Sequence, residues 1–167
     1  MSTESETTHT AAIRKGLRLG KSERLHHKRL VERLFREGNS FYAYPVRVIF
    51  TVEPVSATVD SFKARAFSEN PSVPPTLSQL GISHLQMMTN VPKRKMHRAV
   101  DRVLLRRRIK EAWRLKRIPL RDELIRRDMS MRVGLIFMAD EKTSYRLIER
   151  RMDQIIARLS RALIPKE

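Results

Sequence analysis

Apolar side chains recur at helical spacing in two long stretches of the chain. The first helix is expected to begin after Ser22, a good N-cap, and to stop at Gly38. Its apolar side is formed by Leu30, Val31, Leu34 and Phe35. A second long helix is expected over residues 143–163, where one side carries Ile148, Met152, Ile155, Ile156, Leu159 and Leu163. Both patterns are typical of helices that pack one side against a core.

Shorter segments have the alternating or continuous apolar pattern of β-strands. Residues 40–53 predict one or two antiparallel strands, with Pro45 between them or at an edge. Residues 82–91 predict a strand whose more polar face carries His84, Gln86, Met88 and Asn90. Residues 131–140 are apolar enough for a buried strand. Residues 54–81 are rich in Pro and Ser, which favours a long loop insertion.

The order of these elements predicts an α+β fold, in which a small mixed sheet is packed by helices that cover one of its faces. Residues 1–20 are polar and lack apolar periodicity, so they are expected to form a flexible N-terminal lead-in. Residues 21–167 are expected to form a single domain, because they hold all the periodic segments.

Positive charge dominates the composition and is concentrated in one segment. The 167 residues contain 35 Lys and Arg against 18 Asp and Glu, which gives a formal net charge of +17. Twelve of these cations lie in residues 93–117, a segment with only two acids. Such a balance predicts a polyanionic partner, with nucleic acid as the first choice and an anionic membrane surface as the second.

Several other classes of protein are disfavoured by the sequence. No apolar run reaches the roughly 18 residues of a membrane helix, and residues 1–13 lack the apolar core of a signal peptide, so a cytoplasmic protein is expected. The absence of Cys excludes disulfides and thiolate sites. The five His show no metal-ligand spacing, and no Gly-rich phosphate loop or Gly-x-Ser-x-Gly motif occurs. No catalytic or metal-binding residue is therefore expected in the protein itself.

The basic segment predicts a helix over residues 102–117 with Asp101 as its N-cap. Its core side is formed by Leu105, Ile109, Ala112 and Trp113. An adjoining side, the cationic stripe, carries Arg102, Arg106, Lys110, Arg114 and Arg117, with Arg107 at its margin. Like charges at i, i+4 repel by a few tenths of a kcal/mol per pair, so a partner such as a row of phosphates is needed to compensate them. The helix N-terminus also favours anions, and the cations just before it are Lys93, Arg94, Lys95 and Arg98.

The segment AVDRVLLRRRIKEAWRLKR resembles the signature helix of the bacterial ribonuclease P protein component. The residues in register with the family pattern are Ala99, Val100, Arg102, Leu105, Arg106, Arg107, Ile109, Lys110, Glu111, Ala112, Trp113 and Arg114. The upstream segments NVPKRK and RLHHKRLVERLFREGNSF are similar to the family's strand end and first helix. In element order, the resemblance covers residues 22–163.

This resemblance implies a ribonuclease P protein-like fold, also described as ribosomal protein S5 domain 2-like. Its element order would be αβββαβα, with a left-handed crossover around the signature helix. The resemblance further implies the RNA-binding subunit of an endoribonuclease that removes the 5′ leader from precursor tRNA, with the catalytic centre in an RNA subunit. Mg²⁺ would be held through that RNA, with none bound by the protein alone, and the protein would be a monomer within the ribonucleoprotein.

The resemblance also assigns roles to two sets of residues. Contacts to the catalytic RNA would be made by Lys93, Arg94, Lys95, Arg98, Arg102, Arg106, Arg107, Lys110 and Arg114. A groove for the leader strand would be lined by Val31, Phe35, His84, Gln86, Met88 and Asn90. No residue would have a catalytic role.

Two features depart from the family pattern. Val103 and Leu104 stand where the family has Asn and Arg, and residues 54–81 stand where relatives have a short link. The chain is then either a divergent member whose RNA contacts have shifted along the helix, or a relative that does not support processing. Two alternatives share its charge: a ribosome-associated RNA-binding protein without enzymatic role, and a DNA-binding regulator. The RNA that co-purifies with the protein tests the first, and a DNA-binding selection tests the second.

Overall fold

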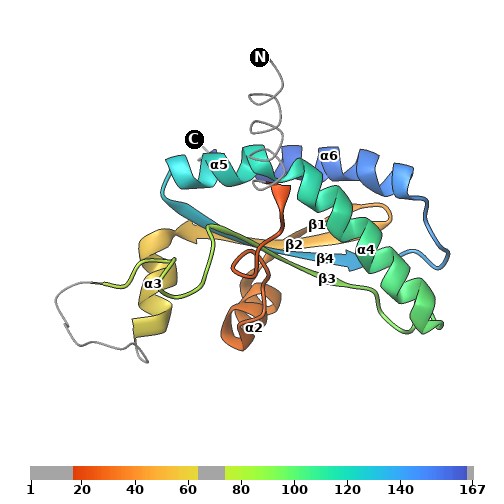
Figure 1. The fold of residues 1–167 in the computed structure, drawn as a ribbon, viewed down its shortest axis with the longest axis horizontal. Helices are drawn as coiled ribbons and strands as arrows, with labels where there is room; N and C mark the ends of the chain where they lie inside the picture. The colour runs from red at the N-terminus through yellow and green to blue at the C-terminus, as the bar shows by residue number, and fades with distance from the viewer. Residues whose placement is uncertain (1–16, 64–73, 165–167) are drawn as a thin grey trace, which may run out of the picture.

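The computed structural model describes residues 17–63 and 74–164, which form a four-stranded sheet with helices on both faces (Figure 1). The strands are β1 (Asn39–Ala43), β2 (Val46–Pro54), β3 (Leu85–Asn90) and β4 (Met129–Phe137), in the spatial order β1-β2-β4-β3. β2 pairs antiparallel with both β1 and β4, whereas β3 pairs parallel with β4. β1 and β2 pair on either side of Tyr44 and Pro45, so the expected separation of two antiparallel strands at Pro45 is confirmed.

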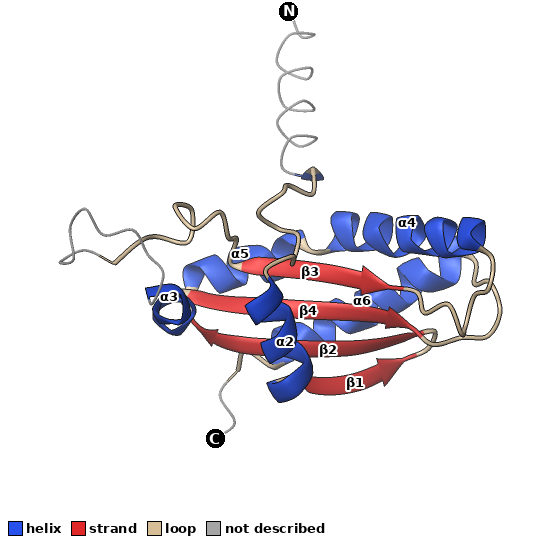
Figure 2. Cartoon of the chain, turned by 90° about the horizontal axis from the view of Figure 1, so that it is seen from below, coloured by secondary structure: helices blue, strands red, loops and turns tan. Residues whose placement is uncertain are grey.

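Three helices cover one face of the sheet and two lie on the other side (Figures 1 and 2). α4 (Ala99–Lys116), α5 (Ile118–Arg126) and α6 (Tyr145–Arg161) share one face. α2 (Lys28–Glu37) and α3 (Val55–Lys63) lie on the opposite side. The α+β class is confirmed, but the prediction that helices cover only one face is wrong.

Two apolar clusters follow from this arrangement. The larger lies between the sheet and α4, α5 and α6, and it includes Trp113 and Phe137. The smaller lies under α2 and α3 and includes Leu34. Because successive strand residues point to opposite faces, Val48 of β2 belongs to the larger cluster and its neighbour Ile49 to the smaller. The central strands are therefore apolar on both sides, which is why a second layer of helices is needed.

α6 has the apolar side that its spacing predicts. Ser144 is the N-cap, and its side-chain oxygen accepts a hydrogen bond from the Leu147 N–H at 3.3 Å. The predicted side is buried throughout, at Ile148, Met152, Ile155, Ile156, Leu159 and Leu163.

α2 begins later than its sequence predicts. Its N-cap is His27, and Ser22 lies outside the helix. The preceding residues instead run along the edge of β3, where the Leu25 N–H donates to the Met87 carbonyl at 2.9 Å and the Met87 N–H donates to the Glu23 carbonyl at 2.9 Å. The predicted N-cap is therefore wrong, because pairing with a strand edge satisfies the backbone of these residues. The predicted stop at Gly38 is confirmed.

Two helices were not expected from the sequence. α3 occupies residues that were predicted as loop, and its Val55, Val59 and Phe62 pack into the smaller cluster. α5 follows α4 at once, with Pro119 in its first turn, where a missing N–H costs nothing. The observed order therefore adds α3 and α5 to the expected αβββαβα. The rest of the predicted insertion includes residues 64–73, which lie outside the described residues, as do residues 1–16 of the predicted lead-in.

Candidate nucleic-acid interface

The core side of α4 is the one that its spacing predicts. Leu105, Ile109, Ala112 and Trp113 are at most 1% exposed and pack into the larger cluster. The helix begins one turn earlier than expected, with Arg98 as the N-cap. Asp101 lies in the first turn instead, where its carboxylate is 3.2 Å from the Lys142 ammonium.

The twelve cations of residues 93–117 divide into two equal groups. Six are bonded within the chain, by ion pairs or by hydrogen bonds to carbonyls, and we call these the internal cations: Lys95, Arg102, Arg108, Arg114, Lys116 and Arg117. The other six make no ion pair or side-chain hydrogen bond with residues 17–63 or 74–164, and we call these the free cations: Lys93, Arg94, Arg98, Arg106, Arg107 and Lys110. Half of the twelve cations therefore have a partner inside the protein, and four of these six are paired with a carboxylate.

Arg117 is the internal cation that departs most from the sequence prediction. Its side chain is fully buried, and its Nε and Nη2 donate to the Glu23 carboxylate at 2.8 and 3.0 Å. It also donates to the carbonyls of Leu17, Arg18 and Arg114. Its place in the cationic stripe is therefore wrong, because α4 ends at Lys116 and the chain turns at Arg117 into α5.

Arg117 affects the pKa of the Glu23 carboxylate. Burial raises its pKa, but hydrogen bonds from Arg117 and from the Gly20 N–H, with the charge of Arg117, outweigh burial and hold the pKa below its ordinary value. The carboxylate and the guanidinium thus tie the chain before α2 to the end of α4. No signal in the sequence marked Glu23, since its partner is 94 positions away.

Two other members of the stripe are also bonded locally. Arg114 donates to the Glu111 carboxylate at 2.7 and 2.8 Å, and this hydrogen bond lowers the pKa of Glu111. Arg102 donates to the carbonyls of Met96 and His97, at 2.9 and 2.6 Å. Part of the hydrogen-bonding capacity of both guanidinium groups is therefore used within the protein.

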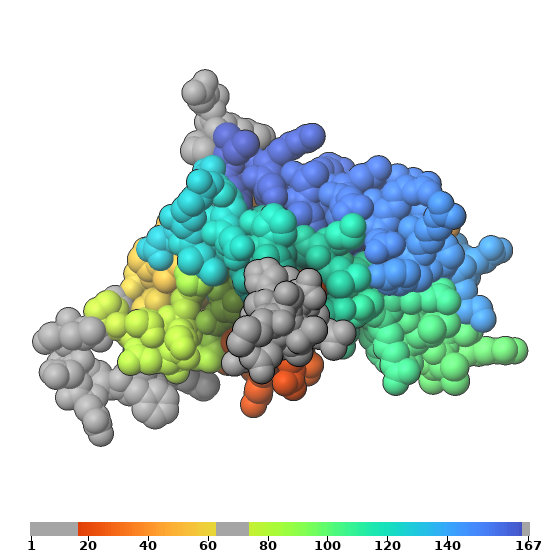
Figure 3. All heavy atoms as spheres, turned by 45° about the horizontal axis from the view of Figure 1, so that its top comes forward, coloured from red at the N-terminus to blue at the C-terminus, as the bar shows by residue number. Residues whose placement is uncertain are grey.

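The free cations lie before α4 and along its first two-thirds. Lys93, Arg94 and Arg98 lie in the turn before the helix, and Arg106, Arg107 and Lys110 lie on its second to fourth turns. Figure 3 shows the segment around residues 93–104, in green, projecting at one end of the molecule. Between the free cations that precede the helix and those on its later turns, the sequence has three exposed apolar side chains: Val100, Val103 and Leu104.

The residues predicted for a leader groove lie on the α2 side of the sheet, but they are not equally accessible. Val31 and Met88 both pack against the smaller cluster, and Phe35 is 48% exposed. Asn90 is exposed at the end of β3. Gln86 is fully buried, and its side-chain N–H₂ donates to the Ser22 carbonyl at 2.7 Å. The chain that pairs with the β3 edge therefore covers Gln86 and removes it from any open groove.

α2 packs closely over Gly134 of β4. A Cβ at this position would lie 3.3 Å from Leu34 Cδ2 and 3.8 Å from the Ile49 carbonyl oxygen. A side chain there would require the Leu34 side chain to shift by a few tenths of an ångström, so the strand and α2 are closely packed at this position.

A buried cation lies on the same side of the sheet. Arg132 is 2% exposed, and burial lowers its pKa to about 10. One guanidinium nitrogen donates to the Met131 carbonyl at 3.2 Å, while Nε and Nη2 have no hydrogen-bond partner among the described residues. His27 and His84 both have lowered pKa values, chiefly through burial and with Arg132 contributing.

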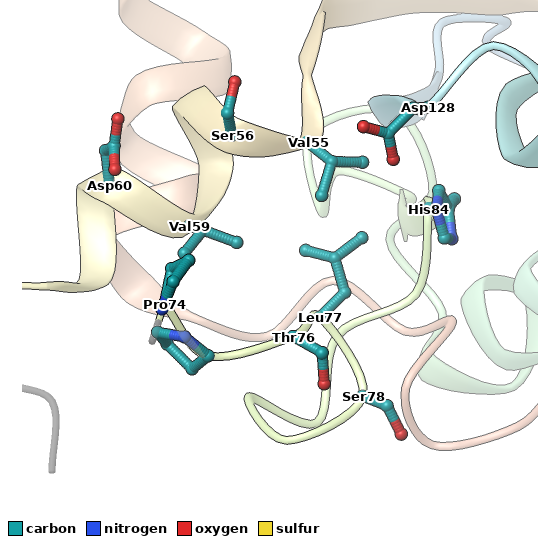
Figure 4. Close-up of a pocket in the computed structure, with 11 residues that line it drawn as sticks. Val55, Ser56, Val59, Asp60, Pro74, Thr76, Leu77, Ser78, His84 and Asp128 are labelled. Atoms are coloured by element: carbon teal, nitrogen blue, oxygen red, sulfur yellow. The ribbon is translucent and has the colours of Figure 1, made fainter. Parts of the chain in front are cut away.

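His84 lies in a different place from the rest of the predicted groove. It lines a cavity of about 620 Å³ between α3 and residues 74–78 (Figure 4). Val55, Val59 and Leu77 point into this cavity, and His84 lies beside Asp128 at one end. α3 is at the opposite end of the molecule from the start of α4 (Figure 1). The apolar cavity and the free cations are therefore separate features, and only the cations suit a polyanion.

Comparison with known proteins bears on the resemblance of α4. No family model matches the chain. Ribonuclease P protein components from two strains of Porphyromonas gingivalis are 27% and 28% identical to it over 142 residues, which is 85% of this chain and 86% of each relative. The chain is similar to ribonuclease P protein components. The similarity extends far beyond the signature helix, so the resemblance predicted from the sequence is confirmed.

Two further properties of the described residues bear on the candidate partners. No helix in this part of the chain combines the length and the apolar character needed to cross a membrane. Within residues 17–63 and 74–164, no three His, Asp or Glu side chains come together as metal ligands.

Proposed function

We propose that this chain is the RNA-binding protein subunit of a bacterial ribonuclease P. It would assist a catalytic RNA in the endonucleolytic removal of the 5′ leader from precursor tRNA. The observation that carries the proposal is the group of six free cations before α4 and along its first two-thirds, in a chain similar to ribonuclease P protein components. The reaction centre would lie in the RNA subunit, and the protein would act from the cytoplasm as a monomer within the ribonucleoprotein.

The free cations would bind phosphates of the catalytic RNA. An arginine fork donates two hydrogen bonds to one phosphate, and each neutralised phosphate releases condensed counterions. Six contacts predict that the logarithm of the binding constant falls with the logarithm of salt concentration at a slope of about −4 to −5. Internal cations such as Arg117 would not count toward this slope, because their charge is already compensated within the protein.

The leader strand of precursor tRNA would lie on the α2 side of the sheet, on the opposite face from α4. Phe35 offers an exposed ring for stacking, and exposed Asn90 offers an amide for hydrogen bonding. Val31 and Met88 would form the apolar floor. Gln86 would support this surface from beneath the chain that pairs with β3, rather than touch the leader.

Mg²⁺ would be supplied through the RNA. The described residues do not bring together a set of carboxylate or imidazole ligands that fits the ion, so no step of the reaction is assigned to a metal on the protein. The chain's own contribution would be to neutralise phosphates that otherwise repel one another when the RNA subunit and precursor tRNA come together.

Reconstitution tests this proposal. The full chain is combined with the candidate catalytic RNA from its own organism, and 5′ leader removal from precursor tRNA is followed at low Mg²⁺. We expect the protein to raise the rate, with a larger effect at low Mg²⁺ than at high Mg²⁺, because cations on the protein replace part of the screening by metal ions. No effect on the rate, with recovery of ribosomal subunits on purification of the protein from cells, would favour the ribosome-associated alternative.

A further inference from the structure

The outward side of α4 begins with an apolar surface. Val100 is 77% exposed, Val103 is 39% exposed and Leu104 is 36% exposed. Positions i, i+3 and i+4 of a helix are neighbours, so these three side chains form one continuous surface, which we call the apolar ridge. The ridge faces away from the core, because Leu105 and Ile109 on the other side of the helix are fully buried.

Free cations flank the apolar ridge on both sides along the chain. Arg98 lies just before it, and Arg106, Arg107 and Lys110 lie just after it. From Arg98 to Arg106 the helix rises by about 12 Å. A partner that contacts both groups of cations must therefore also cover the ridge.

The charge around the ridge limits what this partner can be. A second copy of the chain seated on the same ridge would bring two groups of six free cations together and would be repelled. A fully paired RNA duplex would meet the cations but would place only its polar backbone over the ridge. An unpaired RNA segment meets both requirements, because its phosphates contact the cations while its exposed bases cover apolar side chains.

We propose that the apolar ridge and its flanking cations bind an unpaired segment of RNA, such as an internal loop or a bulge. This inference rests on the proposed function in one respect only, that the partner of α4 is RNA. It specifies the kind of RNA element, which charge alone does not. Val103 and Leu104 would cover base faces, and the cations on either side would hold the phosphates that enter and leave the loop.

Two RNA hairpins provide the test. One carries an internal loop of unpaired purines, and the other has the same sequence on one strand with the loop closed by complementary bases. The full chain is compared with the double variant Val103→Thr, Leu104→Gln, which keeps β-branching and length but removes apolar surface. Leu115→Gln is the matched control, since Leu115 is also 36% exposed on α4 but lies beyond the free cations.

We expect the double variant to bind the looped hairpin about fivefold to tenfold more weakly, the loss that removing this apolar contact should cause. Its binding to the closed hairpin should change by less than about twofold, and the salt dependence should keep its slope, because no phosphate contact is removed. Leu115→Gln should leave both affinities unchanged. Equal thermal unfolding of all three proteins would show that the fold is intact.

Two outcomes would overturn the inference. One is an equal loss on both hairpins, or no loss on either, in a variant that unfolds like the parent. The other is wild-type affinity for RNA with loss of binding to vesicles of anionic phospholipid, which would make the ridge a membrane contact. Failure of leader removal in reconstitution, with preference for the looped hairpin retained, would instead refute the proposed function and leave the RNA contact standing.

Discussion

The internal and free cations of residues 93–117 have the same chemistry but different surroundings. Arg117 and Arg106 both belong to the stripe that helical spacing predicts, yet Arg117 is fully buried against Glu23 and Arg106 has no partner in the described residues. This difference shows that the number of basic residues in a segment is larger than the number of cations that are available to a ligand. Carboxylates and carbonyls of the chain already bond six of the twelve cations.

The largest effect on the fold is expected from an internal cation. Arg117→Ala should lower the free energy of unfolding by about 3–5 kcal/mol, because it leaves the buried Glu23 carboxylate without its partner. Urea denaturation measures this change. Adding Glu23→Ala should recover part of the loss, since no buried charge then remains unpaired. A loss of less than about 1 kcal/mol would show that Arg117 is not the buried anchor described above.

The next largest effect is expected from two free cations. Arg106→Ala with Lys110→Ala should reduce the salt slope of RNA binding by about two and weaken binding at least tenfold near physiological salt. The free energy of unfolding should stay within about 0.5 kcal/mol of the parent, because neither side chain has a partner in the described part of the chain. Titration of RNA at several salt concentrations measures the slope.

The matched control for that variant removes the same charge from the same helix. Arg114→Ala with Lys116→Ala deletes two cations that are already paired, with Glu111 and with Asp153. We expect this variant to change the salt slope of RNA binding less than Arg106→Ala with Lys110→Ala does. An equal reduction by both double variants would mean that the division into internal and free cations has no consequence for RNA binding.

The smallest effect is expected for the pH dependence of the free energy of unfolding, which involves His27. The pKa of His27 is lowered by burial, with His26 and Arg132 contributing, so the unfolded chain binds a proton more readily than the folded one. The free energy of unfolding should therefore fall as the pH drops below about 6.5, the ordinary pKa of His. Glu23 does not contribute to this pH dependence. Because its pKa is lowered by folding, protonation of its carboxylate reduces the free energy of unfolding only below pH 4.5.

Denaturation at about pH 7 and about pH 5.5 measures this dependence. His27→Gln should flatten it, since the substituted side chain takes up no proton. Arg132→Met should flatten it less, because burial and not Arg132 is the chief cause of the lowered pKa. If His27→Gln unfolds with the full pH dependence of the parent, the proton is taken up elsewhere, and His84 is the next residue to replace.

Local periodicity alone determined much of this molecule. The core side of α4, the buried side of α6 and the pair of strands around Pro45 were all predictable, because each depends on where apolar residues fall within one helix or strand. The basic character of the interface was equally visible in the composition. The sequence by itself therefore specified these elements and the basic character of the candidate interface.

Only the tertiary structure decided which cations face solvent and which residues remain open. Glu23 meets Arg117 across 94 positions of sequence, and the chain before α2 pairs with β3 and covers Gln86. α3 was not predicted for the same reason, because its apolar side chains are buried in a cluster that also draws residues from α2, β2 and the segment around Leu77. An ion pair or a strand pairing depends on distance in space, and spacing along one element carries no information about a partner that folding brings from elsewhere.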